Sequence, residues 1–163
     1  IPTYLSAETR GTLTERFSYC FEGKGGYPSI LDLRDELVPL ELVKISGAGG
    51  DIEFLPLDME HGRIRCLGFR IGNLAYCNDV NGLPEETLEA LKGIDTLIID
   101  ALRYTPHPSH ANLDQALEWI ADISPRLAVL TNMHIDMDYQ TLCKDLPTGV
   151  IPGHDGLRLD FII

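Results

Sequence analysis

The sequence predicts an α/β fold with one domain. Its first half is rich in short apolar or alternating runs bounded by turn residues, which are typical of strands. In its second half, such runs alternate with segments whose apolar residues recur every three or four positions, which is typical of helices. Strands that alternate with helices favour a parallel sheet. A length of 163 residues suits a single domain, so we expect residues 1–163 to pack as one unit.

In the first half, the sequence predicts a short strand, a helix and then a series of antiparallel strands. Ser6 is suited to a helix start, and Leu13, Phe17 and Cys20 recur at helical spacing, which predicts a helix over 7–20. Gly72-Asn73 predicts a two-residue hairpin turn. The expected strands cover 1–5, 37–38, 40–45, 52–57, 64–71 and 74–76.

In the second half, the sequence predicts three helices with strands between and after them. Pro84 at the first position and Gly93 after the end predict a helix over 84–92. Asn112 is a suitable N-cap for a helix over 113–123, and a third helix is expected over 139–146. The expected strands cover 94–100, 127–130 and 157–162.

Composition excludes several classes of protein. A formal net charge of −12, from 13 Lys and Arg against 25 Asp and Glu, repels phosphate backbones and argues against general nucleic-acid binding. No apolar run approaches the roughly 20 residues of a membrane helix, so no membrane partner is expected. The four cysteines form no Cys-x-x-Cys pair, which predicts buried reduced thiols in a cytoplasmic protein and no thiolate zinc site.

Histidine and aspartate residues follow the ends of several predicted strands. If these strands share one sheet, their ends meet at one edge, and imidazole with carboxylate suits zinc, manganese or iron at a hydrolytic site. Each residue also has a structural alternative: His61 as a turn residue, Asp79 as a helix cap and Asp100 as a hydrogen-bonding partner. The strand-end residues are His61, Asp79, Asp100, His107, His110, Asn132, His134, Asp136 and Asp138.

The loop after the apolar run Leu97-Ile98-Ile99 carries two of these histidines. Pro106 and Pro108 forbid both a continued strand and an immediate helix, which predicts a stiff loop at the end of a core strand. Loops in this position often carry catalytic groups in layered α/β proteins.

Five motifs in order resemble the latter part of a metallo-β-lactamase-fold hydrolase. Among such hydrolases, the chain resembles the phosphoribosyl cyclic phosphate phosphodiesterases associated with carbon–phosphorus lyase. The resemblance runs from Ile1 to Phe161 and implies part of an αββα four-layer sandwich with a two-metal site at one edge. The motifs are His61-Gly62, Leu74-Ala75-Tyr76-Cys77-Asn78-Asp79-Val80-Asn81, Asp100-Ala101-Leu102-Arg103 with Pro106-His107-Pro108-Ser109-His110, Leu130-Thr131-Asn132-Met133-His134, and Asp155-Gly156.

The resemblance implies a role for each matching residue. His61 matches a metal-binding histidine, Asp79 the carboxylate that bridges both metals, and His110 a histidine that acts on the substrate phosphate as proton donor or oxyanion stabiliser. His107 and Asp100 are expected to bind the substrate, with His107 also shaping the loop.

One position departs from the family pattern. Asn132 falls where the family places its last metal-binding histidine, and His134 follows two residues later. Because residues two apart in a strand face the same side, His134 is expected to replace that ligand, with the Asn132 carbonyl oxygen as the alternative.

The His-x-His-x-Asp-His loop of the family does not occur in this sequence. We therefore expect this chain to be the C-terminal part of a larger domain, completed by an N-terminal segment of the same protein, with two manganese or zinc ions in the complete enzyme. The expected function is metal-dependent hydrolysis of a small cyclic phosphate ester or nucleotide-like substrate. Thioester or acyl hydrolysis and a non-catalytic nucleotide- or metabolite-binding role stay open, as does a homodimer.

Overall fold

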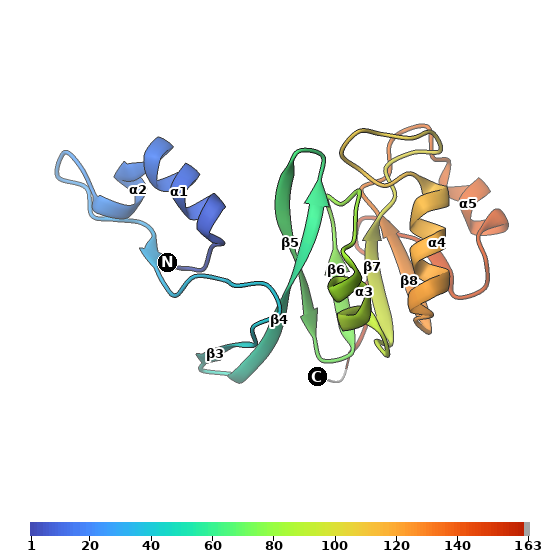
Figure 1. The fold of residues 1–163 in the computed structure, drawn as a ribbon, viewed down its shortest axis with the longest axis horizontal. Helices are drawn as coiled ribbons and strands as arrows, with labels where there is room; N and C mark the ends of the chain where they lie inside the picture. The colour runs from blue at the N-terminus through green and yellow to red at the C-terminus, as the bar shows by residue number, and fades with distance from the viewer. Residues whose placement is uncertain (162–163) are drawn as a thin grey trace.

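The central feature of the computed structural model, which describes residues 1–161, is a seven-stranded mixed sheet with the strands in chain order (Figure 1). Strands β3 to β6 are antiparallel neighbours, and β6 to β9 are parallel. The strands are β3 (Val43–Gly47), β4 (Gly50–His61), β5 (Ile64–Ile71), β6 (Leu74–Cys77), β7 (Thr96–Asp100), β8 (Leu127–Thr131) and β9 (Val150–Pro152).

Helices α3 (Glu85–Leu91) and α4 (Leu113–Ile123) lie over β6, β7 and β8, and α5 (Tyr139–Asp145) follows β8 (Figure 1). Leu97 and Ile99 are fully buried in β7, and they lie on the same face of the sheet because side chains alternate along a strand. They belong to one apolar core with residues of the neighbouring strands and helices. Because β6, β7 and β8 are parallel, their carboxyl ends meet at one edge of this core.

The first 35 residues form a smaller lobe that stands apart from the parallel half of the sheet (Figure 1). Strands β1 (Pro2–Thr3) and β2 (Asp32–Leu33) pair in parallel, and helices α1 (Ala7–Arg16) and α2 (Ser18–Glu22) lie between them in the sequence. Neither helix has a buried residue. This lobe therefore adds little to the core that positions the strand ends.

The α/β fold is confirmed, and several elements lie where the sequence predicts them. The helix over 113–123 begins after Asn112, whose side chain accepts a hydrogen bond from the Gln115 backbone N–H. The strand over 64–71 and the hairpin at Gly72-Asn73 are also confirmed, with Gly72 at φ +54°. A left-handed backbone at that position is easiest for glycine.

Three predictions of elements are wrong. The helix over 7–20 is interrupted at Phe17, which has φ −129° and ψ 37°; the apolar spacing continues across the break and does not reveal it. Residues 37–38 form no strand because Leu37 and Leu40 bond singly to Leu5 and Pro56 across a connecting loop. The strand over 52–57 is confirmed, but it is longer than expected because it lies within β4, which continues to His61.

The third error concerns the last predicted strand. The final strand was expected over 157–162, but β9 forms earlier, and the described part, 157–161, contains no strand. Leu157, Leu159 and Phe161 line a cavity of about 640 Å³ against Ile98 and Val129 instead of pairing. Ile162 lies outside the described residues.

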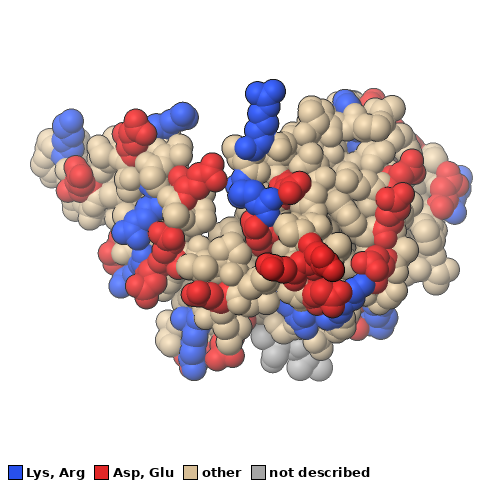
Figure 2. Space-filling model, viewed as in Figure 1, with Lys and Arg blue, Asp and Glu red and all other residues tan. Residues whose placement is uncertain are grey.

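Acidic side chains outnumber basic ones on the face over α3 (Figure 2), where Glu85, Glu86 and Glu89 are exposed. In the described residues, no helix is long and apolar enough to cross a membrane. Trp119 packs against the core, and Tyr139 is partly exposed.

Candidate active site

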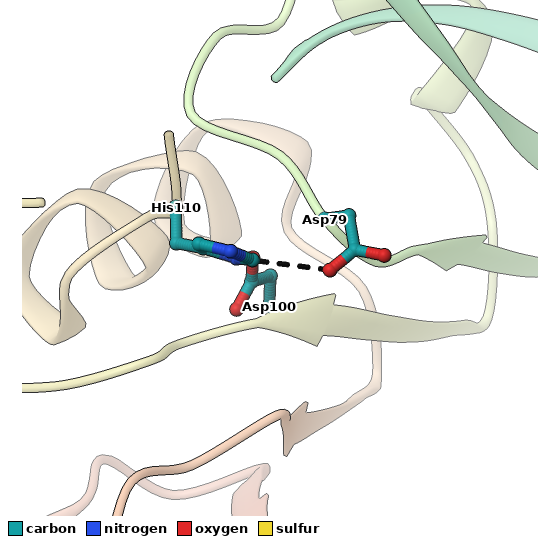
Figure 3. A group of neighbouring side chains, drawn as sticks. All are labelled: Asp79, Asp100 and His110. Atoms are coloured by element: carbon teal, nitrogen blue, oxygen red, sulfur yellow. Dashed lines mark hydrogen bonds and ion pairs between the residues drawn. The ribbon is translucent and has the colours of Figure 1, made fainter. Parts of the chain in front are cut away.

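Acidic and imidazole side chains gather where the parallel strands end. Asp79 follows β6, Asp100 ends β7, and His110 lies in the loop after β7 (Figure 3). One oxygen or nitrogen atom from each of the three lies within 4.8 Å of the others. The strand-end pattern in the sequence therefore corresponds to a real cluster in space.

Asp100 and His110 form a close pair at the centre of the cluster. Asp100 Oδ2 lies 2.7 Å from His110 Nδ1, and the Val80 backbone N–H donates to the same oxygen at 3.2 Å. Burial raises the pKa of the Asp100 carboxyl, and the hydrogen bonds from His110 and Val80 offset part of that rise. The carboxylate of Asp100 accepts a hydrogen bond from the Nδ1–H of His110. The ring nitrogen that is available for proton transfer is therefore Nε2.

The burial of Asp100 bears on its expected roles. The residue has no exposed surface, and its carboxylate accepts a hydrogen bond from His110 Nδ1, which favours the role of a hydrogen-bonding partner. This arrangement matches the way a buried carboxylate holds a catalytic imidazole in one tautomer.

Asp79 presents its carboxylate to solvent beside this pair. Its side chain is 53% exposed, and Oδ1 lies 3.7 Å from His110 Nδ1. Asp79 has φ +57°, a left-handed conformation that aspartate tolerates better than most residues. This left-handed turn after β6 directs the Asp79 carboxylate toward His110 (Figure 3).

His61 approaches the cluster from the end of β4. Its Nδ1 lies 2.7 Å from the Ser109 carbonyl oxygen, and its ring centroid lies 4.7 Å from that of His110. A carbonyl can only accept, so Nδ1 carries the proton and Nε2 has the free lone pair. Metal-binding histidines are commonly oriented in this way by a hydrogen bond from the other ring nitrogen.

Asn132 joins the cluster from the end of β8. Its Nδ2 lies 3.5 Å from Asp79 Oδ1, 3.3 Å from Asp100 Oδ1 and 3.2 Å from His110 Nδ1. Asn132 has φ +60° and follows the last residue of β8, so the alternation of a strand does not extend beyond it.

His134 is not brought to the cluster. Its Nδ1 pairs with Asp136 Oδ2 at 3.1 Å, and its side chain is 52% exposed. The expectation that His134 shares a face with Asn132 is wrong because the chain turns between them. Asn132 is therefore the residue that occupies the expected position at this edge.

Two residues that support the site were missed in the sequence. Asn81 Oδ1 accepts from the Gly62 backbone N–H at 2.9 Å, and Asn81 Nδ2 donates to the Pro108 carbonyl at 3.0 Å. Asn81 thus joins the His61 turn to the loop that carries His110. Its position two residues after Asp79 at a strand end was the available signal. The other residue is Ser109, which acts through its backbone, so its residue type gave no signal.

The donor atoms of the cluster fit a divalent metal. Two carboxylates with imidazole nitrogen are a ligand set that zinc, manganese and iron accept. Asp79 and His61 have the more available donor atoms, whereas Asp100 already accepts from three protein groups. A pair of ions needs roughly eight donor positions, which is more than this cluster offers by itself among residues 1–161.

Comparison with known proteins identifies the family to which this chain belongs. Residues 1–135 match the family model of the beta-lactamase superfamily domain, so the chain belongs to that family. The predicted family is confirmed.

Two individual proteins are similar to this chain over nearly its whole length. A crystal structure of a new diphosphatase from the PhnP family is similar with a TM-score of 0.85 and 28% identity, over 99% of this chain and 59% of that one. A curated octanoyltransferase of Porphyromonas gingivalis (strain ATCC BAA-308 / W83) is 31% identical over 161 residues, which is 97% of this chain and 32% of that protein. The chain thus spans about a third of this curated relative.

A more distant structure shows the shared fold alone. Zn(2+)-bound PqqB from Methylobacterium extorquens is similar with a TM-score of 0.72 and 14% identity, over 99% of this chain and 65% of that one.

Proposed function

We propose that this chain carries part of the active site of a metal-dependent hydrolase that cleaves a small phosphodiester. Cyclic phosphate esters and nucleotide-like compounds are the substrate class that we infer. Membership of the beta-lactamase superfamily and the likeness to a PhnP-family diphosphatase support this proposal. The observation that carries it is the meeting of Asp79 and the Asp100–His110 pair at one sheet edge.

The proposed chemistry assigns separate tasks to these residues. His110 donates a proton from Nε2 to the leaving oxygen, and Asp100 stabilises the charged imidazole and holds its orientation. Asp79 and His61 are the residues that would hold metal, and Asn132 borders the same space with its amide. When bound, a pair of manganese or zinc ions supplies an activated water and neutralises charge on the phosphate.

The substrate class is tested by a rate comparison. The protein is stripped with a chelator, reloaded with manganese or zinc, and offered a cyclic phosphodiester and an octanoyl thioester. We expect hydrolysis of the phosphodiester that returns on reloading. A reloaded protein that does not hydrolyse the phosphodiester would contradict the proposal.

A second candidate function is cleavage of an acyl or thioester bond by the same site. It is favoured by one observation, the 31% identity to a protein named octanoyltransferase, of which this chain spans 32%. Faster cleavage of the thioester than of the phosphodiester in the same comparison would replace our first proposal with this one.

A further inference from the structure

The imidazole rings of His61 and His107 both lie against that of His110, and the proposed chemistry uses only His61 and His110. The ring centroid of His110 lies 4.7 Å from that of His61 and 5.1 Å from that of His107. Within residues 1–161, the one buried side-chain nitrogen or oxygen without a hydrogen-bond partner is Asn78 Oδ1. The Nε2 atoms of the three histidines have no hydrogen-bond partner among the described residues and are not buried in this way, so they are accessible to solvent or to a ligand.

The partners of the Nδ1 atoms distinguish the three rings. His61 and His110 face acceptors, the Ser109 carbonyl and the Asp100 carboxylate, so Nδ1 of each carries a proton. His107 faces a donor, because the Ser109 backbone N–H points to its Nδ1 at 3.3 Å. Nδ1 of His107 therefore has the lone pair, and its proton lies on Nε2.

The segment around Ser109, which sets two of these tautomers, is held on both sides. The Asn81 side chain donates to the Pro108 carbonyl at 3.0 Å. The Arg103 guanidinium donates to the carbonyls of Thr105 at 3.0 Å and Pro106 at 2.5 Å. These hydrogen bonds hold the loop that carries His107 and thereby fix the orientation of its ring.

The surroundings of His107 also favour its neutral form. Burial lowers the pKa of the His107 imidazole, and the positive charge of Arg103 lowers that pKa further. A neutral imidazole with a fixed Nε2–H remains a hydrogen-bond donor at neutral pH without exchanging its proton with a substrate.

We propose that His107 binds the substrate as a neutral hydrogen-bond donor, with its Nε2–H directed to a non-bridging phosphoryl oxygen. The three rings then divide the work by tautomer: His61 offers a lone pair to metal, His110 transfers a proton, and His107 binds an oxygen without proton transfer. The phosphoryl ligand rests on the proposed function, whereas the tautomer of His107 does not.

The tautomers are measured by long-range ¹H–¹⁵N correlation spectra of the imidazole rings. The chain has five histidines, and the signals of interest are assigned with His61→Gln, His107→Gln and His110→Gln. We expect His107 to show a protonated Nε2 and an unprotonated Nδ1, and His61 to show the opposite. A protonated Nδ1 in neutral His107 would overturn the proposed donor.

The ligand is tested with inorganic phosphate added to the metal-loaded protein. We expect the His107 Nε2–H signal to shift and His107→Phe to weaken phosphate binding about tenfold, as loss of one hydrogen bond predicts. His107→Gln, which keeps an N–H donor, should recover part of that loss. His134→Phe is the control, because His134 lies outside the cluster. Equal phosphate affinity in the wild type and His107→Phe would overturn the phosphoryl ligand.

This experiment separates the inference from the proposed function. Phosphate binding at His107 in a protein that cleaves no phosphodiester would leave the inference standing and remove the function. If folded His107→Phe had the wild-type KM for a phosphodiester, the proposed function would stand and the inference about His107 would be removed.

Discussion

At the scale of single residues, the site depends on which atom of each side chain is already bonded. Asp100 is buried and bonded to His110, whereas Asp79 is exposed beside them. Two aspartates at neighbouring strand ends therefore have different surroundings, and we propose that one orients His110 and the other binds a ligand. The residue type does not distinguish Asp79 from Asp100, because the two differ in burial.

His110 gives the first prediction. We expect His110→Ala to lower kcat for a phosphodiester by roughly 10²- to 10⁴-fold, the usual contribution of a positioned proton donor. His134→Ala removes an imidazole that is 52% exposed and bonded to Asp136, and should keep wild-type kcat. Steady-state kinetics on the two variants checks this, and an unchanged rate in His110→Ala would remove its catalytic role.

Much of the site at residue scale could be predicted from the sequence. His61, Asp79, Asp100, His110 and Asn132 all lie at or beyond strand ends, and parallel pairing brings such positions together. His134 could not be excluded, because the left-handed turn at Asn132 depends on the folded chain. Ser109 could not be predicted either, because it contacts His61 and His107 through its backbone and the residue type gives no indication of this.

At the scale of elements, the turn between β4 and β5 and the loop after β7 are in close contact. Gly62 has φ +65°, and a Cβ atom there would lie 2.9 Å from Ser109 Cβ. Gly72, in the turn between β5 and β6, has φ +54° and open space around the same position. The two glycines therefore share a backbone constraint but differ in what a side chain would meet.

Gly62→Ala and Gly72→Ala form a matched pair for the second prediction. Both should lower the free energy of unfolding by about 1 kcal/mol because of the left-handed backbone. Only Gly62→Ala should also displace Ser109 and reduce kcat, because Ser109 orients His61 and His107. Equal kcat in the two variants, measured with their thermal unfolding, would show that this contact does not hold the site.

Elements with strong periodicity were the ones that the sequence predicted well. The helix over 113–123 and the strand over 64–71 have long patterns and clear boundaries. β9 has three residues and forms through its pairing with β8, so local sequence says little about it. The break at Phe17 is likewise a backbone event within a continuous apolar pattern.

At the scale of the whole molecule, the core between the sheet and its helices contains an ionisable thiol. Cys77 is fully buried, and burial raises its pKa to about 12. Unfolding returns this thiol to an ordinary pKa near 8.5. The stability that the protonated thiol preserves is therefore complete below about pH 8.5 and is lost as pH rises toward 12.

This gives a third prediction, on alkaline unfolding. Between about pH 8.5 and 12, Cys77 should reduce the free energy of unfolding by about 1.4 kcal/mol per pH unit. Cys77→Ala should flatten that part of the pH profile, whereas substitution of the exposed Cys143 by alanine should not. Urea unfolding at a series of pH values checks this, and identical slopes for the three proteins would contradict a buried protonated thiol.

The arrangement of the whole molecule joins these scales, because the core fixes the strand ends and the strand ends fix the cluster. We propose that this cluster, formed by Asp79 and the Asp100–His110 pair, serves metal-dependent phosphodiester hydrolysis. The most direct test is the hydrolysis rate of a cyclic phosphodiester after chelation and manganese reloading, in the wild type and in Asp79→Asn. We predict that chelation abolishes the wild-type rate, that manganese restores it, and that Asp79→Asn stays inactive under both conditions. A rate that survives chelation, or that Asp79→Asn retains in full after reloading, would contradict the claim.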